Sequence, residues 1–355
     1  MKRTISCIAA ALGLAFAASG CSLSGGDDSG GATSTDGGPS RVVLVTHDSF
    51  ALPKPLIAAW QTRTGYRLVV RRAGDAGALT NKLVLTKDRP IGDVAFGVDN
   101  TFASRALDAG VFEKTDAEIP VGAGPFQLPG ADGRIVPVDD ANVCVNVDTA
   151  WFAARNRRPP ATFDDLTKPA YRNLFVTPGA PTSSPGMAFF LATVARYGDG
   201  WKGYWGRLMA NGAKVTSGWS HAYEVDFTAG GGGGSRPVVV SYDSSPAFTV
   251  SKDGTRSTTK ALLDTCFRQV EYVGALAGAR NPEGARAVID MLLSPEAQAA
   301  LPISMYVFPV RDGVALPREW AAFAKQPARP AALPPDTITA NRETWLREWT
   351  DVTSR

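Results

Sequence analysis

The stretch RVVLVTHDSF, residues 41–50, decides the fold class, because an apolar run rich in β-branched residues ends abruptly in polar residues. Such a run predicts a buried strand from Arg41 to Thr46. Leu56, Ile57 and Trp60 recur at helical spacing and predict a helix directly after it. Strands are expected at 41–46, 66–71 and 94–98, and helices at 53–64, 77–86 and 102–109. This alternation predicts an α/β fold with a mostly parallel sheet.

The rest of the chain continues the same alternation. Strands are expected at 141–147, 174–176, 238–241 and 267–276, and helices at 163–166 (a helix start), 187–197, 201–211, 282–293, 294–300 and 344–352. The run Gly230 to Gly234 predicts a surface turn, because a phosphate-binding loop needs Lys and Ser/Thr at the start of a helix. The roughly 315 residues that follow the first 40 suit two lobes better than one, since single cores stop growing near ~250–300 residues.

The first 40 residues predict export. Lys2 and Arg3 precede an apolar segment shorter than the ~20 residues of a membrane span, so residues 1–20 are expected to be a signal peptide. Ala18-Ser19-Gly20-Cys21 resembles a lipobox and implies lipidation of Cys21; a plain signal peptide with an incidental cysteine is the alternative. Residues 21–40, rich in Gly, Ser and Asp, are expected to form a flexible tether. We expect anchoring on the outer face of the cytoplasmic membrane, in the periplasm or cell envelope.

Composition argues against several classes of function. A net charge of +3 over 355 residues is too small for a nucleic-acid-binding protein, which would need a strongly basic domain. The chain has two histidines, His47 and His221, and no G-x-S-x-G, H-E-x-x-H or C-x-x-C motif, so we expect no enzyme, no metal site and no cofactor. Cys144 and Cys266 form an even pair in an oxidising compartment and predict a disulfide; two buried free thiols are the alternative.

Polar and aromatic residues gather just after the predicted strands, where open α/β sheets bind ligands. The segments are Thr46–Phe50, Asp99–Thr101, Thr182–Gly186, Ser217–Ser220 and Ser241–Pro246, with Met305–Pro309 after a helix pair. Their aromatic residues suit a flat or cationic ligand, and hydroxyl and N–H groups at a helix start suit an anion such as phosphate. A single aromatic residue could instead belong to the core, and Asp99 could simply cap the next helix.

These stretches, in this order, resemble the periplasmic thiamine-binding proteins, which have the type II periplasmic-binding-protein fold. The most specific are GWSHAY (218–223) and SYDSSPA (241–247); the others are THDSF (46–50), DVAFGVDN (93–100), SSPG (183–186), LSPEAQ (293–298) and FPV (308–310). The resemblance covers about Val42 to Arg355. It implies a two-lobed clamp with a two-strand hinge, acting as a solute-binding lipoprotein of an ABC importer. Such a protein would capture thiamine or a thiamine phosphate in the interlobe cleft and deliver it, as a monomer, to the permease subunits.

The resemblance also implies which residues bind the ligand. They are His47, Asp48, Ser49, Asp99, Asn100, Ser183, Ser184, Gly186, Gly218, Trp219, Ser220, Tyr223, Tyr242, Ser245 and Tyr306. Asp99 and Asn100 would bond the aminopyrimidine edge and Tyr242 would pack on the rings, while the segments around Ser183 and Gly218 would hold the hydroxyethyl or phosphate end. The chain departs from the family at two positions: His47 stands where the family usually has Tyr, and Tyr306 stands where it usually has Trp. Both changes reduce the aromatic surface around the expected ligand. A protonated His47 would also repel a thiazolium.

The implied clamp divides the folded part into a first lobe (41–138), a second lobe (139–265), a return segment of the first lobe (266–312) and a C-terminal helical segment across both lobes (313–355). The chain would cross between the lobes near Asp139 and Phe267, which makes these two strands the hinge. Cys144 and Cys266 would then lie across or beside the hinge. Closure of the lobes would sequester the ligand from water.

Two rival functions stay open. A protein of the same fold could bind another small cation, ferric ion or an anion. Ferric-binding proteins that resemble this fold use paired tyrosines as ligands, and this chain has no two adjacent tyrosines. A polyamine would need several carboxylates in the cleft, and only Asp99 and Asp243 are obvious candidates. A secreted thiamine-degrading enzyme would need Cys144 as its nucleophile, and that cysteine lies in an apolar run without a neighbouring base.

Overall fold

The computed structural model describes residues 40–354. The predicted signal peptide, the tether up to residue 39 and the lipidation site at Cys21 lie outside these residues. Within residues 40–354, no helix has the length and apolar character needed to cross a membrane.

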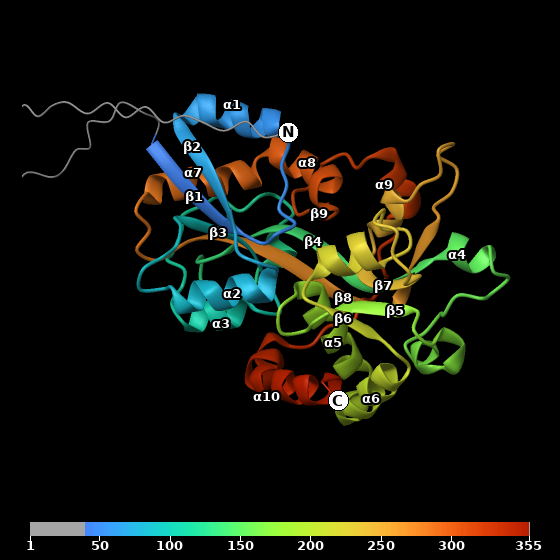
Figure 1. Cartoon of the computed structure of the whole chain (residues 1–355). Helices are drawn as coiled ribbons and strands as arrows, with labels where there is room; N and C mark the ends of the chain where they lie inside the picture. Colours follow the sequence, from blue (N-terminus) through green and yellow to red (C-terminus); the bar gives the residue numbers. More distant parts are fainter. Residues whose placement is uncertain (1–39, 355) are drawn as a thin grey trace, which may run out of the picture. The chain divides into compact units, whose positions relative to one another are not determined.

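One mixed sheet of nine strands organises the described chain (Figure 1). The strand order is β2-β1-β3-β8-β4-β7-β5-β6, and β9 pairs with β4. The strands are β1 (Ser40–Thr46), β2 (Tyr66–Arg72), β3 (Val94–Asp99), β4 (Val136–Asp148), β5 (Phe175–Pro178), β6 (Lys214–Thr216), β7 (Val238–Tyr242), β8 (Thr259–Ala275) and β9 (Phe308–Pro309). We call the β1–β3 side the first half and the β5–β7 side the second half. The expectation of a mostly parallel sheet is corrected: pairs within each half are parallel, but β8 and β4 run antiparallel to their partners.

Helices cover both faces of this sheet. They are α1 (Lys54–Thr64), α2 (Ala76–Leu85), α3 (Ala103–Asp108), α4 (Thr149–Ala153), α5 (Ser184–Tyr197), α6 (Trp201–Ala210), α7 (Pro282–Leu293), α8 (Pro295–Met305), α9 (Arg318–Phe323) and α10 (Pro335–Thr353). In the first half, α1 and α7 lie on one face and α2 and α3 on the other (Figure 1). Apolar residues on both sides of β1 and β3 explain why these strands read as continuous apolar runs in the sequence.

The long strands β4 and β8 join the two halves. Every residue of β4 is buried, and β4 pairs with β8 along nearly its whole length. On the first-half side β3 pairs with residues 271–275 of β8, and on the second-half side β7 pairs with residues 143–147 of β4. Between these two zones the halves are connected by β4 and β8, with β9 pairing at Asp139 and Asp140. This crossing is the candidate hinge, and the lobe boundaries drawn from the sequence stay predictions.

A disulfide links the two crossing strands. Cys144 of β4 and Cys266 of β8 are bonded although 122 residues separate them in sequence. The β4–β8 register shifts at this point, where the Thr265 hydroxyl accepts a hydrogen bond from the Val145 N–H at 2.9 Å. Because Cys144 also pairs with Ser241 of β7, the bond lies beside the crossing, on its second-half side.

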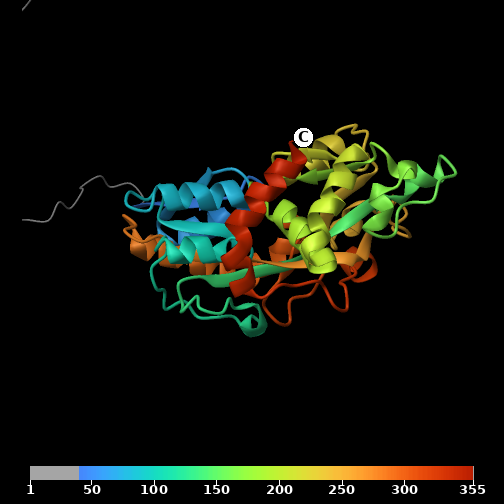
Figure 2. The same ribbon diagram turned by 90° about the horizontal axis from the view of Figure 1, so that it is seen from below.

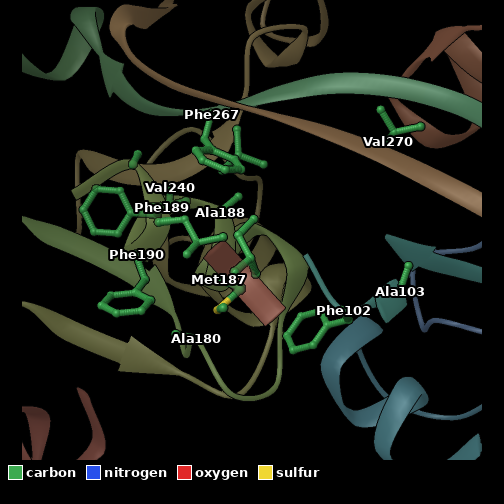
Figure 3. Packing of buried hydrophobic residues seen from close by; sticks show 14 of the residues in the cluster. Phe102, Ala103, Ala180, Met187, Ala188, Phe189, Phe190, Val240, Phe267 and Val270 are labelled. Atoms are coloured by element: carbon green, nitrogen blue, oxygen red, sulfur yellow. The ribbon is translucent and has the colours of Figure 1, made fainter. Parts of the chain in front are cut away.

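The hydrophobic core extends through both halves. Phe102 and Ala103 of the first half belong to the same buried cluster as Met187 and Phe189 of α5 (Figure 3). The C-terminal helix α10 adds a second connection, and Figure 2 shows it running between the two halves. Its Trp349 ring packs on Trp205 of α6 at 5.2 Å, while the Arg342 guanidinium donates to the Ser104 hydroxyl of the first half at 2.8 Å.

Candidate ligand-binding cleft

A cleft of about 330 Å³ opens between the two halves, at the carboxyl ends of β1, β2 and β7. Seven of the residues expected to bind ligand line it: His47, Asp48, Ser49, Trp219, Ser220, Tyr242 and Tyr306. Four charged residues that the sequence analysis did not single out line it as well: Arg72, Asp75, Glu224 and Glu271. The cleft is therefore more acidic than the sequence suggested.

Aromatic rings form one wall of the cleft. The Trp219 ring lies 6.0 Å from Tyr242 and 6.4 Å from Tyr306, measured between centroids. Tyr223 stacks on Trp219 at 5.0 Å with an interplanar angle of 14° but does not line the cleft. Burial holds the pKa of the Tyr242 phenol well above its usual value, so this ring stays neutral at physiological pH. A neutral, electron-rich wall of this kind attracts a flat cation.

Hydroxyl groups behind the wall fix the orientation of Trp219. Its indole N–H donates to the Ser241 Oγ at 2.9 Å, and the Ser241 and Ser245 hydroxyls lie 2.8 Å apart. The Ser245 Oγ also accepts the Tyr242 backbone N–H at 3.2 Å. Ser245 thus supports the wall from the protein side rather than lining the cleft.

His47 and Glu271 form the floor of the cleft. The His47 Nε2 lies 3.6 Å from the Glu271 Oε1, and both residues are buried. Burial opposes protonation of His47, but the carboxylates of Glu271, Asp75 and Asp48 outweigh it and raise the His47 pKa above its usual value. Gly97 makes room for this ring: it has a φ of +97°, and a β-carbon there would lie 2.1 Å from the His47 Cδ2.

Buried polar groups lie beneath this floor. Asp139 faces Glu271 across the β4–β8 ladder, and burial followed by repulsion from Glu271 and Asp140 holds the Asp139 pKa well above its usual value. This favours a protonated Asp139. The Gln269 amide lies within 3.5 Å of the Tyr242 hydroxyl.

Asp75 joins the two halves across the cleft. Its Oδ2 accepts the Trp219 backbone N–H at 2.9 Å, and its Oδ1 accepts the Ala76 N–H at 2.8 Å at the start of α2. Gly218 permits this approach, since a β-carbon there would lie 3.0 Å from the same Oδ2. Burial raises the Asp75 pKa, while bonds from Trp219, Ser183 and Ala76 oppose that rise.

Two further contacts cross between the halves. The Ser49 and Ser220 hydroxyls are 3.4 Å apart, and the Gly77 N–H donates to the Thr182 carbonyl at 3.0 Å. Together with the Asp75 bond they hold the two halves against each other, so the described chain has the geometry of a closed clamp.

Asp99 and Asn100 do not line the cleft. The Asp99 Oδ1 accepts the Thr101 and Phe102 N–H groups, both at 3.1 Å, and so caps the turn that enters α3. Burial raises the Asp99 pKa to about 7, although the Ser184 and Thr101 hydroxyls act against it. Asn100 extends the sheet, because its Oδ1 accepts the Val270 N–H at 2.9 Å. In this structure Asp99 therefore acts as a helix cap, which was the second interpretation of its position in the sequence.

The start of α5 is also occupied by the protein itself. Ser183 caps the helix through a 3.4 Å bond from the Gly186 N–H, and Ser184 is buried. A β-carbon at Gly186 would lie 2.5 Å from the Gly179 carbonyl oxygen, so this glycine allows close packing. Ser183, Ser184 and Gly186 do not line the cleft, and neither does Gly218.

Cys144, which a thiamine-degrading enzyme would need as a nucleophile, is bonded to Cys266 and does not line the cleft. Among residues 40–354 no group of three or more His, Cys, Asp or Glu side chains is arranged to hold a metal ion.

A closed cleft between two α/β halves, with an aromatic wall and a carboxylate floor, defines a solute-binding protein. The chain belongs to the family described as bacterial extracellular solute-binding proteins, whose sequence model matches residues 89–328. Its relatives include the thiamine-binding periplasmic protein of Salmonella typhimurium (strain LT2), 27% identical over 88% of this chain and 94% of that one. The protein of the same name from Brucella melitensis is 27% identical over 89% of this chain and 92% of that one. The resemblance inferred from sequence motifs is confirmed.

Solved structures confirm the fold. A periplasmic thiamin binding protein superimposes with a TM-score of 0.77 at 27% identity, covering 89% of this chain and 96% of that one. Iron-bound HitA from Pseudomonas aeruginosa superimposes with a TM-score of 0.66 at 18% identity, covering 88% of this chain and 99% of that one, which shows the fold alone. The predicted α/β, two-lobed type II periplasmic-binding-protein fold is correct.

Proposed function

We propose that this protein captures thiamine or a thiamine phosphate outside the cytoplasmic membrane and delivers it to an ABC permease. The observation that carries the proposal is the pairing of an aromatic wall with carboxylates in one closed cleft. Thiamine offers a flat, permanently charged ring, and the relatives named above are thiamine-binding proteins. We further propose that Cys21 carries the lipid anchor and that the protein works as a monomer.

The chemistry of the cleft fits a cationic heterocycle. The Trp219 and Tyr242 rings supply π faces, and a cation over such a face gains ~0.5–2 kcal/mol. Buried Glu271 on the floor and half-buried Asp75 beside it supply carboxylates, and charge attraction is stronger there than at the surface. The contacts between Asp75 and Trp219 and between Ser49 and Ser220 would then seal the ligand from water before the permease recognises the closed form.

Titration calorimetry tests this proposal. The mature chain, made without lipid as Cys21→Ser, is expected to bind at least one of thiamine, thiamine monophosphate and thiamine diphosphate with a submicromolar Kd. Tyr242→Ala removes one ring of the wall and is expected to raise that Kd at least tenfold, whereas Tyr197→Ala removes a ring that does not line the cleft and should change it less than twofold. Absence of heat with all three ligands, from a folded and ligand-free sample, would contradict the proposal.

Affinity is expected to depend on pH through His47. A cationic ligand and the His47 proton are stabilised by the same carboxylates, so ligand binding favours the neutral imidazole. Because the His47 pKa is raised, protonation weakens binding already near neutral pH, and affinity for thiamine should rise between pH 6 and pH 8.5 by on the order of tenfold. In His47→Phe the rise should be absent. A rise of the same size in that variant would assign the pH dependence to another group.

One structural observation supports a second candidate. Asp48, Asp75, Glu224 and Glu271 all line the cleft, and this is more carboxylates than the two, Asp99 and Asp243, that the sequence suggests for a polyamine. The same titration with spermidine separates the two functions: tight binding of spermidine without binding of any thiamine form would favour the polyamine.

A further inference from the structure

Arg72 is the one arginine or lysine among the residues that line the cleft. It ends β2 and is exposed, whereas His47, Trp219 and Glu271 are buried. The charges of the cleft are therefore unevenly distributed: carboxylates lie at the buried floor and at the rim, and a permanent positive charge lies at the exposed rim only.

The Arg72 guanidinium is held in place by neutral groups. Its Nε donates to the Asp48 carbonyl at 3.1 Å, and its Nη2 donates to the Phe50 carbonyl at 3.0 Å. It takes part in none of the ion pairs formed within residues 40–354. A guanidinium that is oriented by backbone carbonyls and has no carboxylate partner keeps donors free for an anion.

The other place where the sequence suggested phosphate binding, the start of α5, lies outside the lining of the cleft. At the start of α5, Ser183 accepts the Gly186 N–H, and neither Ser183, Ser184 nor Gly186 lines the cleft. A phosphate group bound in the cleft would meet a permanent cation only at Arg72, because the other basic side chain of the lining, His47, lies on the buried floor and loses its charge on deprotonation.

We propose that Arg72 is a specificity-determining residue that binds the phosphate end of the ligand, with the cationic ring inward against Trp219 and Tyr242. This inference rests on the proposed function. It predicts that the protein binds thiamine monophosphate and diphosphate more tightly than thiamine, by roughly tenfold, the effect of a charge-assisted hydrogen bond at an exposed site. The preference should weaken as salt is added.

Competition calorimetry on the mature chain with Arg72→Gln and Arg72→Lys tests the inference. Arg72→Gln should abolish the preference for the phosphate forms and leave the Kd for thiamine within threefold, and Arg72→Lys should retain part of the preference. Arg71→Gln is the matched control: Arg71 is the preceding residue of β2, donates to the Ile91 carbonyl and does not line the cleft. Arg71→Gln should leave all three affinities unchanged.

The outcomes separate this inference from the proposed function. Failure of the unmodified protein to bind any thiamine form would overturn both. Binding of thiamine with no phosphate preference, or with a preference that survives in Arg72→Gln, would overturn the role of Arg72 and leave the proposed function standing. An equal loss of all three ligands in Arg72→Gln would show that Arg72 acts by holding the turn from Asp48 to Phe50, and would also overturn the inference.

Discussion

Replacement of Asp75 by alanine is expected to weaken thiamine binding at least 30-fold. The change removes a carboxylate from the cleft and the acceptor for the Trp219 N–H, and so leaves a donor without its partner when the halves close. Hydrogen bonds to charged groups contribute ~1.5–3 kcal/mol, and 1.4 kcal/mol corresponds to a tenfold change in affinity. Calorimetry gives the affinity, and small-angle X-ray scattering with and without ligand shows whether the halves still close.

Asp75→Asn separates the charge from the hydrogen bond. Asparagine can still accept the Trp219 N–H, so this variant should close but bind the cation more weakly than the unmodified protein. Ser220→Ala is the control for a minor contact across the cleft, because the Ser49–Ser220 pair is long at 3.4 Å. A Kd for Asp75→Ala within threefold of the unmodified value would remove Asp75 from the binding machinery.

Removal of the disulfide is expected to have the largest effect on stability. Cys144→Ala with Cys266→Ala frees two positions separated by 122 residues. A cross-link that closes a loop of about 100 residues lowers the entropy of the unfolded chain and so raises the free energy of unfolding by ~4–5 kcal/mol. At roughly 2–4 °C per kcal/mol, the value for chains of 150–250 residues, the melting temperature should fall by about 8–20 °C if the full effect is realised.

Ligand affinity should respond differently from stability. Neither cysteine lines the cleft, so the double variant should bind thiamine with a Kd within twofold of the unmodified protein at a temperature where both are folded. Addition of a reductant to the unmodified protein should reproduce the loss of stability. A melting temperature that changes by less than 2 °C in both experiments would show that the bond contributes little.

The sequence predicted the helices and strands whose apolar pattern is uninterrupted. The first three strands and helices were placed within two residues of their ends, because burial on both faces makes β1 and β3 continuous apolar runs. The strands β4 and β8 begin earlier than predicted. In β4, polar Asp139 and Asp140 are buried in the crossing, so polarity there does not mark a strand end. In β8, exposed Lys260 and Asp264 interrupt the apolar pattern before Phe267, although the strand already runs through them. The predicted helix start at 163–166 is a short 3₁₀ turn.

The cleft was predicted in part, by the rule that ligands bind after strands. The rule found His47, Trp219 and Tyr242, but it equally selects residues that cap the following helix, as Asp99 and Ser183 do. Position after a strand also marks Asp75, which follows β2 and caps α2, so the same rule applies to this residue.

Glu271 illustrates what the sequence could not show. It lies within the predicted strand from 267 to 276, where neighbouring Val and Tyr residues indicate burial. A buried carboxylate there requires a partner, and that partner, His47, is distant in sequence and meets it only because β1, β3 and β8 are adjacent in the sheet. Arg72 reads as an ordinary strand-end residue until its carbonyl contacts are known.

The strand order has a consequence for how the chain acquires its structure as it is made. Because β8 lies between β3 and β4, the first half cannot complete its sheet until the whole second half and then β8 have been synthesised. The chain therefore emerges with β3 unpaired on one edge over a long stretch of synthesis, a state that exposes a strand edge to aggregation or proteolysis. The link made by α10 forms last of all, so a ribosome or secretion channel releases nearly the entire chain before the two halves are joined on both sides.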